Sequence, residues 1–401
     1  MTVIRPNPTL SNDLISEILV RLPVKSILCF QLVCKDWLSL IKCPTFIKSQ
    51  LLHAITTQTD QTFIISRYEH HQKKIFSLLH ANSREIVADL QIPYSPGDFN
   101  TIIVGSANGI VCFVVAVNFP KYKASIYLWN PAIRRSKLIP SYSNELRRWL
   151  GYDGFGYDPI DDDYKVVRVL SRPSSSSKHR LFSAKVYSTN NNVWRKVLDP
   201  IDIPSVGNFD VCVNGYLCSI GKYGMMSFDL NKEVFNFATK LPVICDHDEA
   251  CIIEFNKSIA IAILIIASND VDPDWKLDRM LNKKINMWSL DDDACLSGGG
   301  VEASWTMMFS INLVMPVELC LGYFCNRDLL LLIRRSDYTR KSWNDYKWIS
   351  CNADKREAKI IPLPVYIAKR NYYCDLYKYT ESLVSLAGFE QVNWPAGEDD
   401  N

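Results

Sequence analysis

The residue types most capable of chemistry occur in short local groups. Residues 245–249 combine a cysteine, a histidine and three carboxylates, all of which can bind a metal. Two ligands on one loop do not form a zinc site, however, and no Cys-x-x-Cys pair elsewhere in the chain would complete one. The aspartate runs 161–163 and 291–293 lack the glycine and distal glutamate of a calcium-binding loop, so we expect solvated turns there. The sequence therefore predicts no metal site.

Signals for enzymatic chemistry are also incomplete. The glycine run 298–300 is not followed by the Lys-Ser/Thr pair of a phosphate-binding loop, and no Gly-x-Ser-x-Gly nucleophile motif occurs. His70 and His71 stand beside Lys73 and Lys74, a pattern typical of an exposed hairpin end rather than a catalytic pair. We predict no catalytic residues and no cofactor.

The composition argues against a nucleic-acid-binding protein and against a membrane-spanning one. The chain has 401 residues and a net charge of +2, which gives no basic footprint for nucleic acid. Its thirteen cysteines are odd in number and follow no signal peptide, so we expect free thiols and a location in the cytoplasm, the nucleus or both. The longest apolar run, residues 259–267, is far shorter than the ~20 residues of a membrane helix, and its isoleucines favour a buried strand.

A short helical module is predicted at the N-terminus. Ser11, Asn12 and Asp13 are N-cap residue types, and they precede an apolar stripe with helical spacing. Pro23 is expected to end this first helix, and a second apolar stripe continues beyond it to Ile41. A module of this size is too small to bury both apolar stripes by itself. We therefore expect it to dock on a partner protein or on the rest of the chain.

The remainder of the sequence is typical of an all-β domain. Asn108-Gly109 and Asn214-Gly215 are hairpin turns between apolar strands. A loose unit of paired strands recurs six times with an average period near the kelch-like value of about 50 residues. We therefore predict a β-propeller of six kelch-like blades, with a β-sandwich as the alternative. Five tryptophans are expected in the core between blades: Trp129, Trp194, Trp288, Trp305 and Trp348.

Ring closure gives the domain boundaries. We expect the strand at residues 63–66 to share one blade with C-terminal strands near residues 372–377 and 383–386. The predicted organisation is a flexible N-terminus, the helical module, the propeller and a polar C-terminal tail, at residues 1–9, 10–51, 60–388 and 389–401.

The helical module resembles a plant F-box, from Leu10 to about Leu51. The Asp-Leu-x-x-Glu-Ile-Leu core, the Leu-Pro-Val-Lys-Ser turn and the Val-Cys-Lys-x-Trp end all occur at the family's spacing. The resemblance implies docking on the Skp adaptor of cullin–RING ubiquitin ligases. Ser11 replaces the proline that usually follows the first leucine and helps form the adaptor contact, which implies weaker binding.

The β body resembles the F-box-associated domain of plant F-box proteins, including F-box/kelch-repeat and S-locus-F-box-like members. The resemblance is found in four segments whose sequences are close to those of the family: residues 105–112, 128–135, 154–158 and 379–384. It implies a non-catalytic substrate receptor of an SCF-type ligase, which captures a target for ubiquitination and proteasomal degradation. Two alternatives stay open: a binding propeller whose F-box does not assemble into a ligase, and a propeller enzyme with convergent polar residues on one face.

Two sets of site residues follow. The adaptor-binding face and its support are predicted to comprise Leu10, Leu14, Ile18, Leu22, Pro23, Val33, Cys34 and Trp37. Long loops between strands carry aromatic residues of the type enriched in interface hot spots, and we expect at least two of them to be exposed on a common face and to bind the target. These residues are Tyr142, Trp149, Trp275, Tyr338 and Trp343.

Overall fold

The fold was established from a computed structural model of the 401-residue chain. It describes residues 10–57, 62–68, 74–83, 85–93, 101–117, 123–140, 150–173, 180–203, 209, 211–221, 224–243, 250–266, 283–297, 302–313, 323–325, 328–334, 346–352, 355, 357–361 and 376–392.

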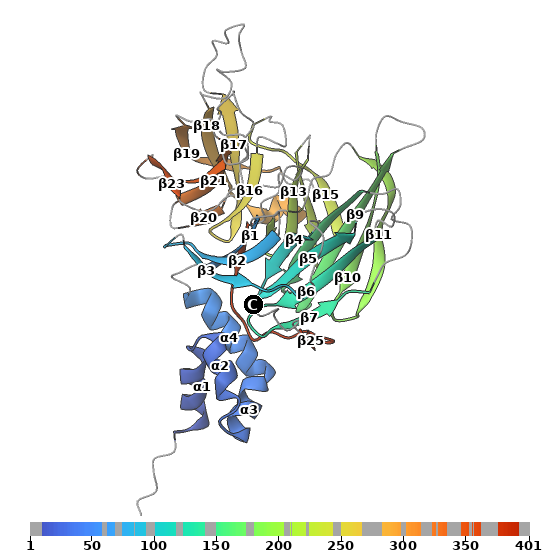
Figure 1. The fold of residues 1–401 in the computed structure, drawn as a ribbon. Helices are drawn as coiled ribbons and strands as arrows, with labels where there is room; N and C mark the ends of the chain where they lie inside the picture. Colours follow the sequence, from blue (N-terminus) through green and yellow to red (C-terminus); the bar gives the residue numbers. More distant parts are fainter. Residues whose placement is uncertain are drawn as a thin grey trace, which may run out of the picture.

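Four helices form the N-terminal module (Figure 1): α1 (Asn12–Val20), α2 (Val24–Phe30), α3 (Lys35–Lys42) and α4 (Pro44–Thr57). The predicted N-cap of α1 is confirmed, because Ser11 Oγ accepts a hydrogen bond from the Leu14 N–H at 3.3 Å. Pro23 separates α1 from α2, as expected. The helical part continues beyond the predicted boundary at residue 51, since neither glycine nor proline interrupts residues 45–57. None of the helices in the described ranges is long and apolar enough to cross a membrane.

The described strands form six antiparallel sheets, which we number along the chain. Sheet 1 contains β24 (Leu376–Tyr379), β1 (Thr62–Tyr68), β2 (Lys74–His80) and β3 (Ile86–Leu90). Sheet 2 contains β4 (Thr101–Ala107), β5 (Ile110–Val117), β6 (Lys123–Asn130), β7 (Arg135–Leu138) and β25 (Glu390–Gln391). Sheet 3 contains β8 (Leu150–Asp158), β9 (Asp163–Pro173), β10 (Arg180–Ser188) and β11 (Val193–Ile203).

The other three sheets follow the same order. Sheet 4 contains β12 (Val211–Val213), β13 (Tyr216–Gly221), β14 (Gly224–Asp229) and β15 (Val234–Thr239). Sheet 5 contains β16 (Ala250–Phe255), β17 (Ser258–Ile266), β18 (Lys283–Leu290) and β19 (Trp305–Leu313). Sheet 6 contains β20 (Tyr323–Cys325), β21 (Asp328–Arg334), β22 (Tyr346–Asn352) and β23 (Glu357–Ile361).

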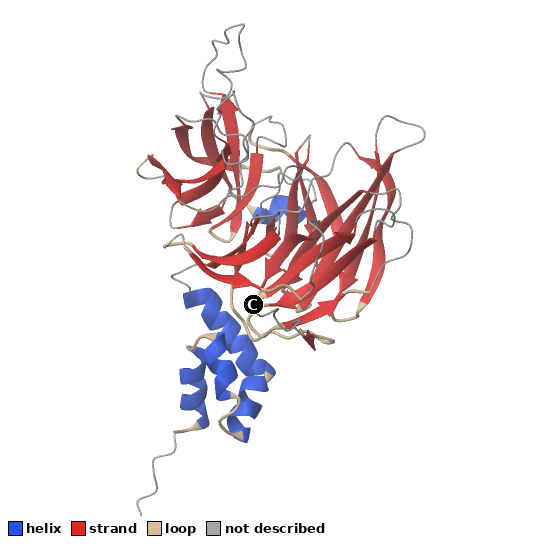
Figure 2. Ribbon diagram, in the orientation of Figure 1, coloured by secondary structure: helices blue, strands red, loops and turns tan. Residues whose placement is uncertain are grey.

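The sheets are arranged as a β-propeller, which confirms the predicted fold class. Contacts between neighbouring sheets run through their first strands, from β24 to β4, then to β8, β12, β16 and β20. The helices gather at one end of the molecule, and within the β domain a short 3-10 helix, Asp293–Ser297, follows β18 (Figure 2). We expected six kelch-like blades from the internal repeat, and six separate sheets are present among the described residues.

The predicted hairpin turns have the backbone that their sequences require. Asn108 and Gly109 have φ values of 51° and 85°, and Asn214 and Gly215 have values of 50° and 82°. Two consecutive residues with positive φ form the turn whose twist matches that of the flanking strands, and Asn-Gly is its preferred sequence. The first of these turns joins β4 to β5 and the second joins β12 to β13.

Ring closure follows the predicted principle but differs in its detail. Strand β24 pairs with β1, from Leu376 opposite Ile65 to Tyr379 opposite Thr62, so the two ends of the β domain share sheet 1. The expected strand at residues 383–386 is absent: this segment is not a strand, because Leu383 packs into the helical module. The propeller also extends past residue 388, since β25 pairs with β7.

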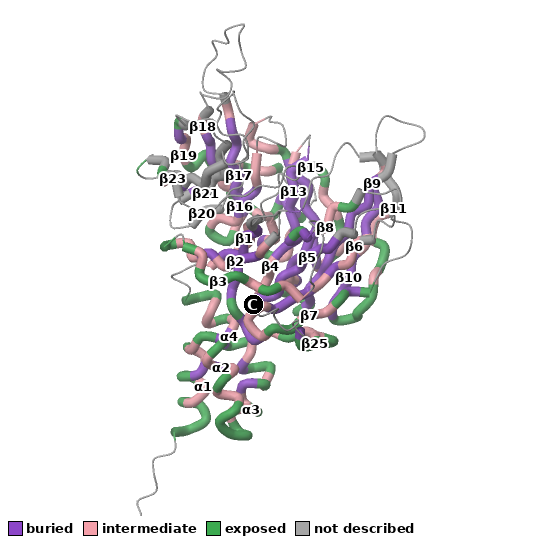
Figure 3. Tube along the Cα trace, viewed as in Figure 1, coloured by how far each residue is buried: buried purple, intermediate pink, exposed green. Residues whose placement is uncertain are grey.

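Buried residues are concentrated in the strands, whereas the helices carry mostly exposed and half-buried residues (Figure 3). Ile259, Ile261 and Ile263 of β17 are all fully buried, as the apolar run predicted. Trp129 is buried as expected, with an edge-to-face contact to Phe113, ring centroids 6.1 Å apart. Three other predicted core tryptophans, Trp194, Trp288 and Trp305, are half-buried and pack against the core, and Trp348 lies in β22.

Candidate functional site

Helix α1 presents apolar residues on two faces. Ile15, Leu19 and Leu22 face the other helices, and Leu19 is 2% exposed. Leu14 and Ile18 point away from this core and are 53% and 50% exposed. Residues four apart lie one above the other on a helix, so these two side chains form a continuous apolar strip. An apolar strip that stays exposed on a helix favours the binding of a partner.

The other residues of the predicted adaptor-binding face fall into two groups, exposed and half-buried. Leu10, Pro23, Val33 and Cys34 are exposed like Leu14 and Ile18. Leu22 and Trp37 are half-buried and pack against the helical core, so they support the face from behind. Trp37 makes an edge-to-face contact with Phe30 at a centroid distance of 5.4 Å.

Cys34 has a structural role as well. Its Sγ accepts the Trp37 N–H at 3.5 Å, and it is the N-cap residue of α3. The turn that it ends contains Leu32, which is 89% exposed and was missing from the predicted face. Leu32 lies outside the 3.6-residue stripe of its segment, and this mismatch with the core-facing spacing was the available signal.

The helical module rests on the turn between β6 and β7 and on sheet 3. Ala132 and Ile133 of that turn pack against the helical core, and so does Leu383 of the C-terminal segment. Lys48 of α4 forms an exposed ion pair with Asp162 of the β8–β9 turn, with Nζ and Oδ2 3.5 Å apart. The exposed strip on α1 is therefore carried at a defined place beside the propeller.

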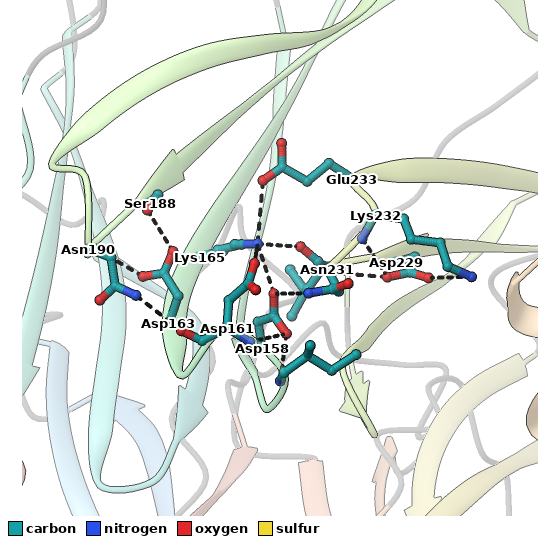
Figure 4. Close-up of polar contacts among 12 residues, drawn as sticks. Asp158, Asp161, Asp163, Lys165, Ser188, Asn190, Asp229, Asn231, Lys232 and Glu233 are labelled. Carbon is teal, nitrogen blue, oxygen red and sulfur yellow. Dashed lines mark hydrogen bonds and ion pairs between the residues drawn. The ribbon is translucent and has the colours of Figure 1, made fainter.

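A buried lysine joins sheets 3 and 4 (Figure 4). Lys165 of β9 is 1% exposed, and its Nζ lies 2.8 Å from Asp158 Oδ2 and 3.4 Å from Glu233 Oε1. The same Nζ donates to the Leu230 carbonyl oxygen at 2.6 Å, and Asp161 Oδ2 lies 3.6 Å away. Asp158 belongs to sheet 3, whereas Leu230 and Glu233 lie in the β14–β15 turn of sheet 4, so the ammonium group links the two sheets.

Both charges of this pair are favoured by their surroundings. Burial alone would raise the pKa of Asp158, but hydrogen bonds from Lys165, Asn231 and two backbone N–H groups outweigh it and hold the pKa below its ordinary value. Burial would lower the pKa of Lys165, but the surrounding carboxylates outweigh it and raise this pKa. With its hydrogen bonds satisfied, the group is a fixed structural contact rather than a titratable catalyst.

The aspartate runs form further structural contacts. Asp163 accepts hydrogen bonds from Ser188 Oγ at 2.6 Å and Thr189 Oγ1 at 2.8 Å, which ties β9 to the β10–β11 turn. Asp293 accepts from Asn214 Nδ2 at 2.8 Å and from Ser258 Oγ at 2.8 Å, between sheets 4 and 5. Asp163 is 3% exposed and its contacts are buried, so the expectation of a solvated turn was wrong for this residue. The contact between Asp293 and Asn214 is exposed. Among the described residues no group of three or more metal-ligand types could hold a metal ion.

The predicted target-binding residues lie outside the described residues: Tyr142, Trp149, Trp275, Tyr338 and Trp343. The group at residues 245–249 lies outside them as well. The prediction that the aromatic residues contact a target therefore stays a prediction.

Comparison with known families identifies both parts of the chain. The family model "F-box associated beta propeller domain" matches residues 51–295, more than half of the chain, and the model "F-box domain" matches residues 8–49. The chain belongs to the F-box proteins with an associated β-propeller. From here we call the helical module the F-box and residues 62–392 the propeller domain.

Similar proteins occur in Arabidopsis thaliana. An F-box/kelch-repeat protein is 31% identical over 244 residues, covering 56% of this chain and 63% of that protein. A putative F-box protein is 28% identical over 253 residues, covering 57% and 56%, and a second F-box/kelch-repeat protein is 26% identical over 309 residues, covering 76% and 68%. The chain thus spans less than two thirds of the length of the first two.

Proposed function

We propose that the chain is a non-catalytic substrate receptor of an SCF-type ubiquitin ligase. The F-box docks on a Skp-family adaptor, which connects it to the cullin–RING ligase. The propeller domain binds a protein target for ubiquitination and proteasomal degradation. Adaptor docking and target binding take place in the cytoplasm, the nucleus or both.

The observation that carries the proposal is the exposed strip on α1. Leu14 and Ile18 are about half exposed on a helix whose opposite face is already buried. Large apolar side chains gain about 1.5–3 kcal/mol each from full burial, so an apolar partner surface would stabilise this face. The F-box family supplies the class of partner, and the strip supplies a contact of the right chemistry.

The propeller domain is expected to bind the target through the long loops between strands, because loops carry recognition residues on a propeller. These loops hold the aromatic residues predicted to contact the target: Tyr142, Trp149, Trp275, Tyr338 and Trp343.

Co-purification tests the proposal directly. The tagged full-length chain should retain a Skp adaptor and a cullin from a plant extract, whereas a Leu14→Asp/Ile18→Asp variant should retain neither. Proteins that accumulate on the wild-type chain after proteasome inhibition, and also on the double variant, are candidate targets. Equal recovery of the adaptor on both chains would reject the proposed function.

A further inference from the structure

The C-terminal segment 380–386, which we call the latch, lies between the F-box and the propeller domain. Leu383 is 4% exposed and belongs to the buried core of the F-box. The other buried members of that core all come from the four helices: Leu19, Val24, Ile27, Ile41 and Phe46. A residue distant in the sequence thus completes the F-box interior.

A buried polar contact supports the same position. Gln50 of α4 is 3% exposed, and its Oε1 accepts the Leu383 N–H at 3.4 Å. A buried amide needs a partner, because an unsatisfied buried polar group costs about 1–3 kcal/mol. The latch therefore supplies both an apolar side chain and a backbone donor to the F-box.

The other side of the latch is held by sheet 2. Asn130 at the end of β6 is fully buried, and its Nδ2 donates to the carbonyl oxygens of Ser382 at 3.0 Å and Val384 at 2.8 Å. Ser382 Oγ donates to the Asn108 carbonyl oxygen at 2.7 Å. Adjacent residues of the latch thus bind the propeller domain while Leu383 between them binds the F-box.

Gly109 makes room for this contact. A Cβ at Gly109 would overlap Ser382 Oγ and lie 2.8 Å from the Thr380 carbonyl oxygen. The glycine also has a φ of +85° in the β4–β5 turn. The turn and the latch therefore require glycine for two separate reasons, conformation and close approach.

Both ends of the latch are anchored in the propeller domain. Upstream, β24 pairs with β1 in sheet 1, and downstream, β25 pairs with β7 in sheet 2. Lys137 Nζ also donates to the Ala387 carbonyl oxygen at 2.9 Å. The Lys48–Asp162 pair, by contrast, is exposed, and such pairs contribute only about 0–1 kcal/mol.

We propose that residues 380–386 complete the F-box core and fix the orientation of the F-box on the propeller domain. The F-box of this chain is then not an independent unit, and its stability depends on residues at the other end of the sequence. The inference rests on intramolecular contacts and is independent of the proposed function.

Two full-length variants probe the latch from opposite sides. Leu383→Ala removes the side chain from the F-box core, and Gly109→Ala displaces Ser382 from the propeller side. Gly215→Ala is the matched control for the second variant: it has the same turn type, with φ +82°, but a Cβ there would meet Pro159 Cδ at 3.2 Å and no part of the latch. Ser385→Ala, at an exposed latch position, is the control for the first.

Hydrogen exchange with mass spectrometry measures how readily the helices of the F-box open. The yield of a zero-length carbodiimide cross-link between Lys48 and Asp162 reports the orientation of the F-box on the propeller domain. Leu383→Ala and Gly109→Ala should speed exchange in α2 and α4 by roughly tenfold or more and should reduce the cross-link several-fold. Gly215→Ala and Ser385→Ala should leave both at the wild-type level. Unchanged F-box exchange and cross-linking in Leu383→Ala, or equal effects of Gly109→Ala and Gly215→Ala, would overturn the proposal.

Discussion

Lys165 Nζ lies 2.8 Å from Asp158 Oδ2 in an ion pair whose two side chains are 1% and 0% exposed. Glu233 of the neighbouring sheet also approaches the ammonium group, and Arg195 pairs with Glu233 at the surface side. Removal of one partner from a buried pair leaves an uncompensated charge, which is far more costly than loss of an exposed pair.

Lys165→Met should therefore destabilise the protein by about 3–5 kcal/mol. Lys232→Met is the control, because Lys232 is 64% exposed in its pair with Asp229 and should cost at most about 1 kcal/mol. Urea unfolding at pH 7 measures both free energies of unfolding. Similar small effects of the two substitutions would contradict the structural role given to Lys165.

The cost of Lys165→Met should depend on pH. In the wild type the pKa of Asp158 is lowered, so its contribution to stability is present above the ordinary value of about 3.9 and is lost as the pH falls further. In the variant Asp158 loses its main partner while remaining buried, and protonation relieves the unpaired charge. The difference in unfolding free energy should therefore shrink between pH 7 and about 4.5. A difference that stays constant over this range would refute the assignment.

The N-cap of α1 gives a smaller, local prediction. Ser11→Ala removes the acceptor of the Leu14 N–H and should destabilise α1 by about 1 kcal/mol. Ser16→Ala, within the same helix, removes no cap and is the control. Faster hydrogen exchange confined to α1 in the Ser11 variant is the expected result, and equal exchange in both variants would show that the cap is dispensable.

Ring closure can be separated from the rest of the C-terminus by two truncations. A chain ending at residue 375 lacks β24, the latch and β25, and it exposes the edge of β1, an aggregation hazard. A chain ending at residue 379 keeps β24 and also lacks the latch and β25, so the two chains differ only in β24. We expect the shorter chain to aggregate and the longer one to melt cooperatively, as judged by light scattering during thermal unfolding. Cooperative melting of the shorter chain would argue against closure by β24.

Local features of the fold could be predicted from the sequence. Ser11 and Pro23 mark the limits of α1 because capping and the loss of a helix hydrogen bond act within a few residues. The Asn108-Gly109 turn is equally local, since its conformation depends on the two residues themselves. The six repeats predicted the propeller for the same reason, because each hairpin carries its own turn and strand pattern.

The contacts that join distant segments could not be predicted in this way. Leu383 belongs to a motif that was expected to add a strand, and its sequence does not indicate that it packs on the F-box. Lys165 is of a residue type that is rarely fully buried, and its burial depends on carboxylates from two turns. Tertiary partners decided both positions, and a single sequence carries no record of them.

The central claim, that the exposed strip on α1 binds the Skp adaptor, is tested most directly by affinity. Ile18→Asp should weaken binding of purified adaptor by at least roughly tenfold, because an apolar contact is lost and a charge is buried in its place. Leu138→Asp is the control, since Leu138 lies on β7 of the propeller domain with a similar exposure of 54% against 50% for Ile18. Biolayer interferometry with the full-length chains should give a raised Kd for Ile18→Asp and a wild-type Kd for Leu138→Asp. A wild-type Kd for Ile18→Asp would contradict the claim.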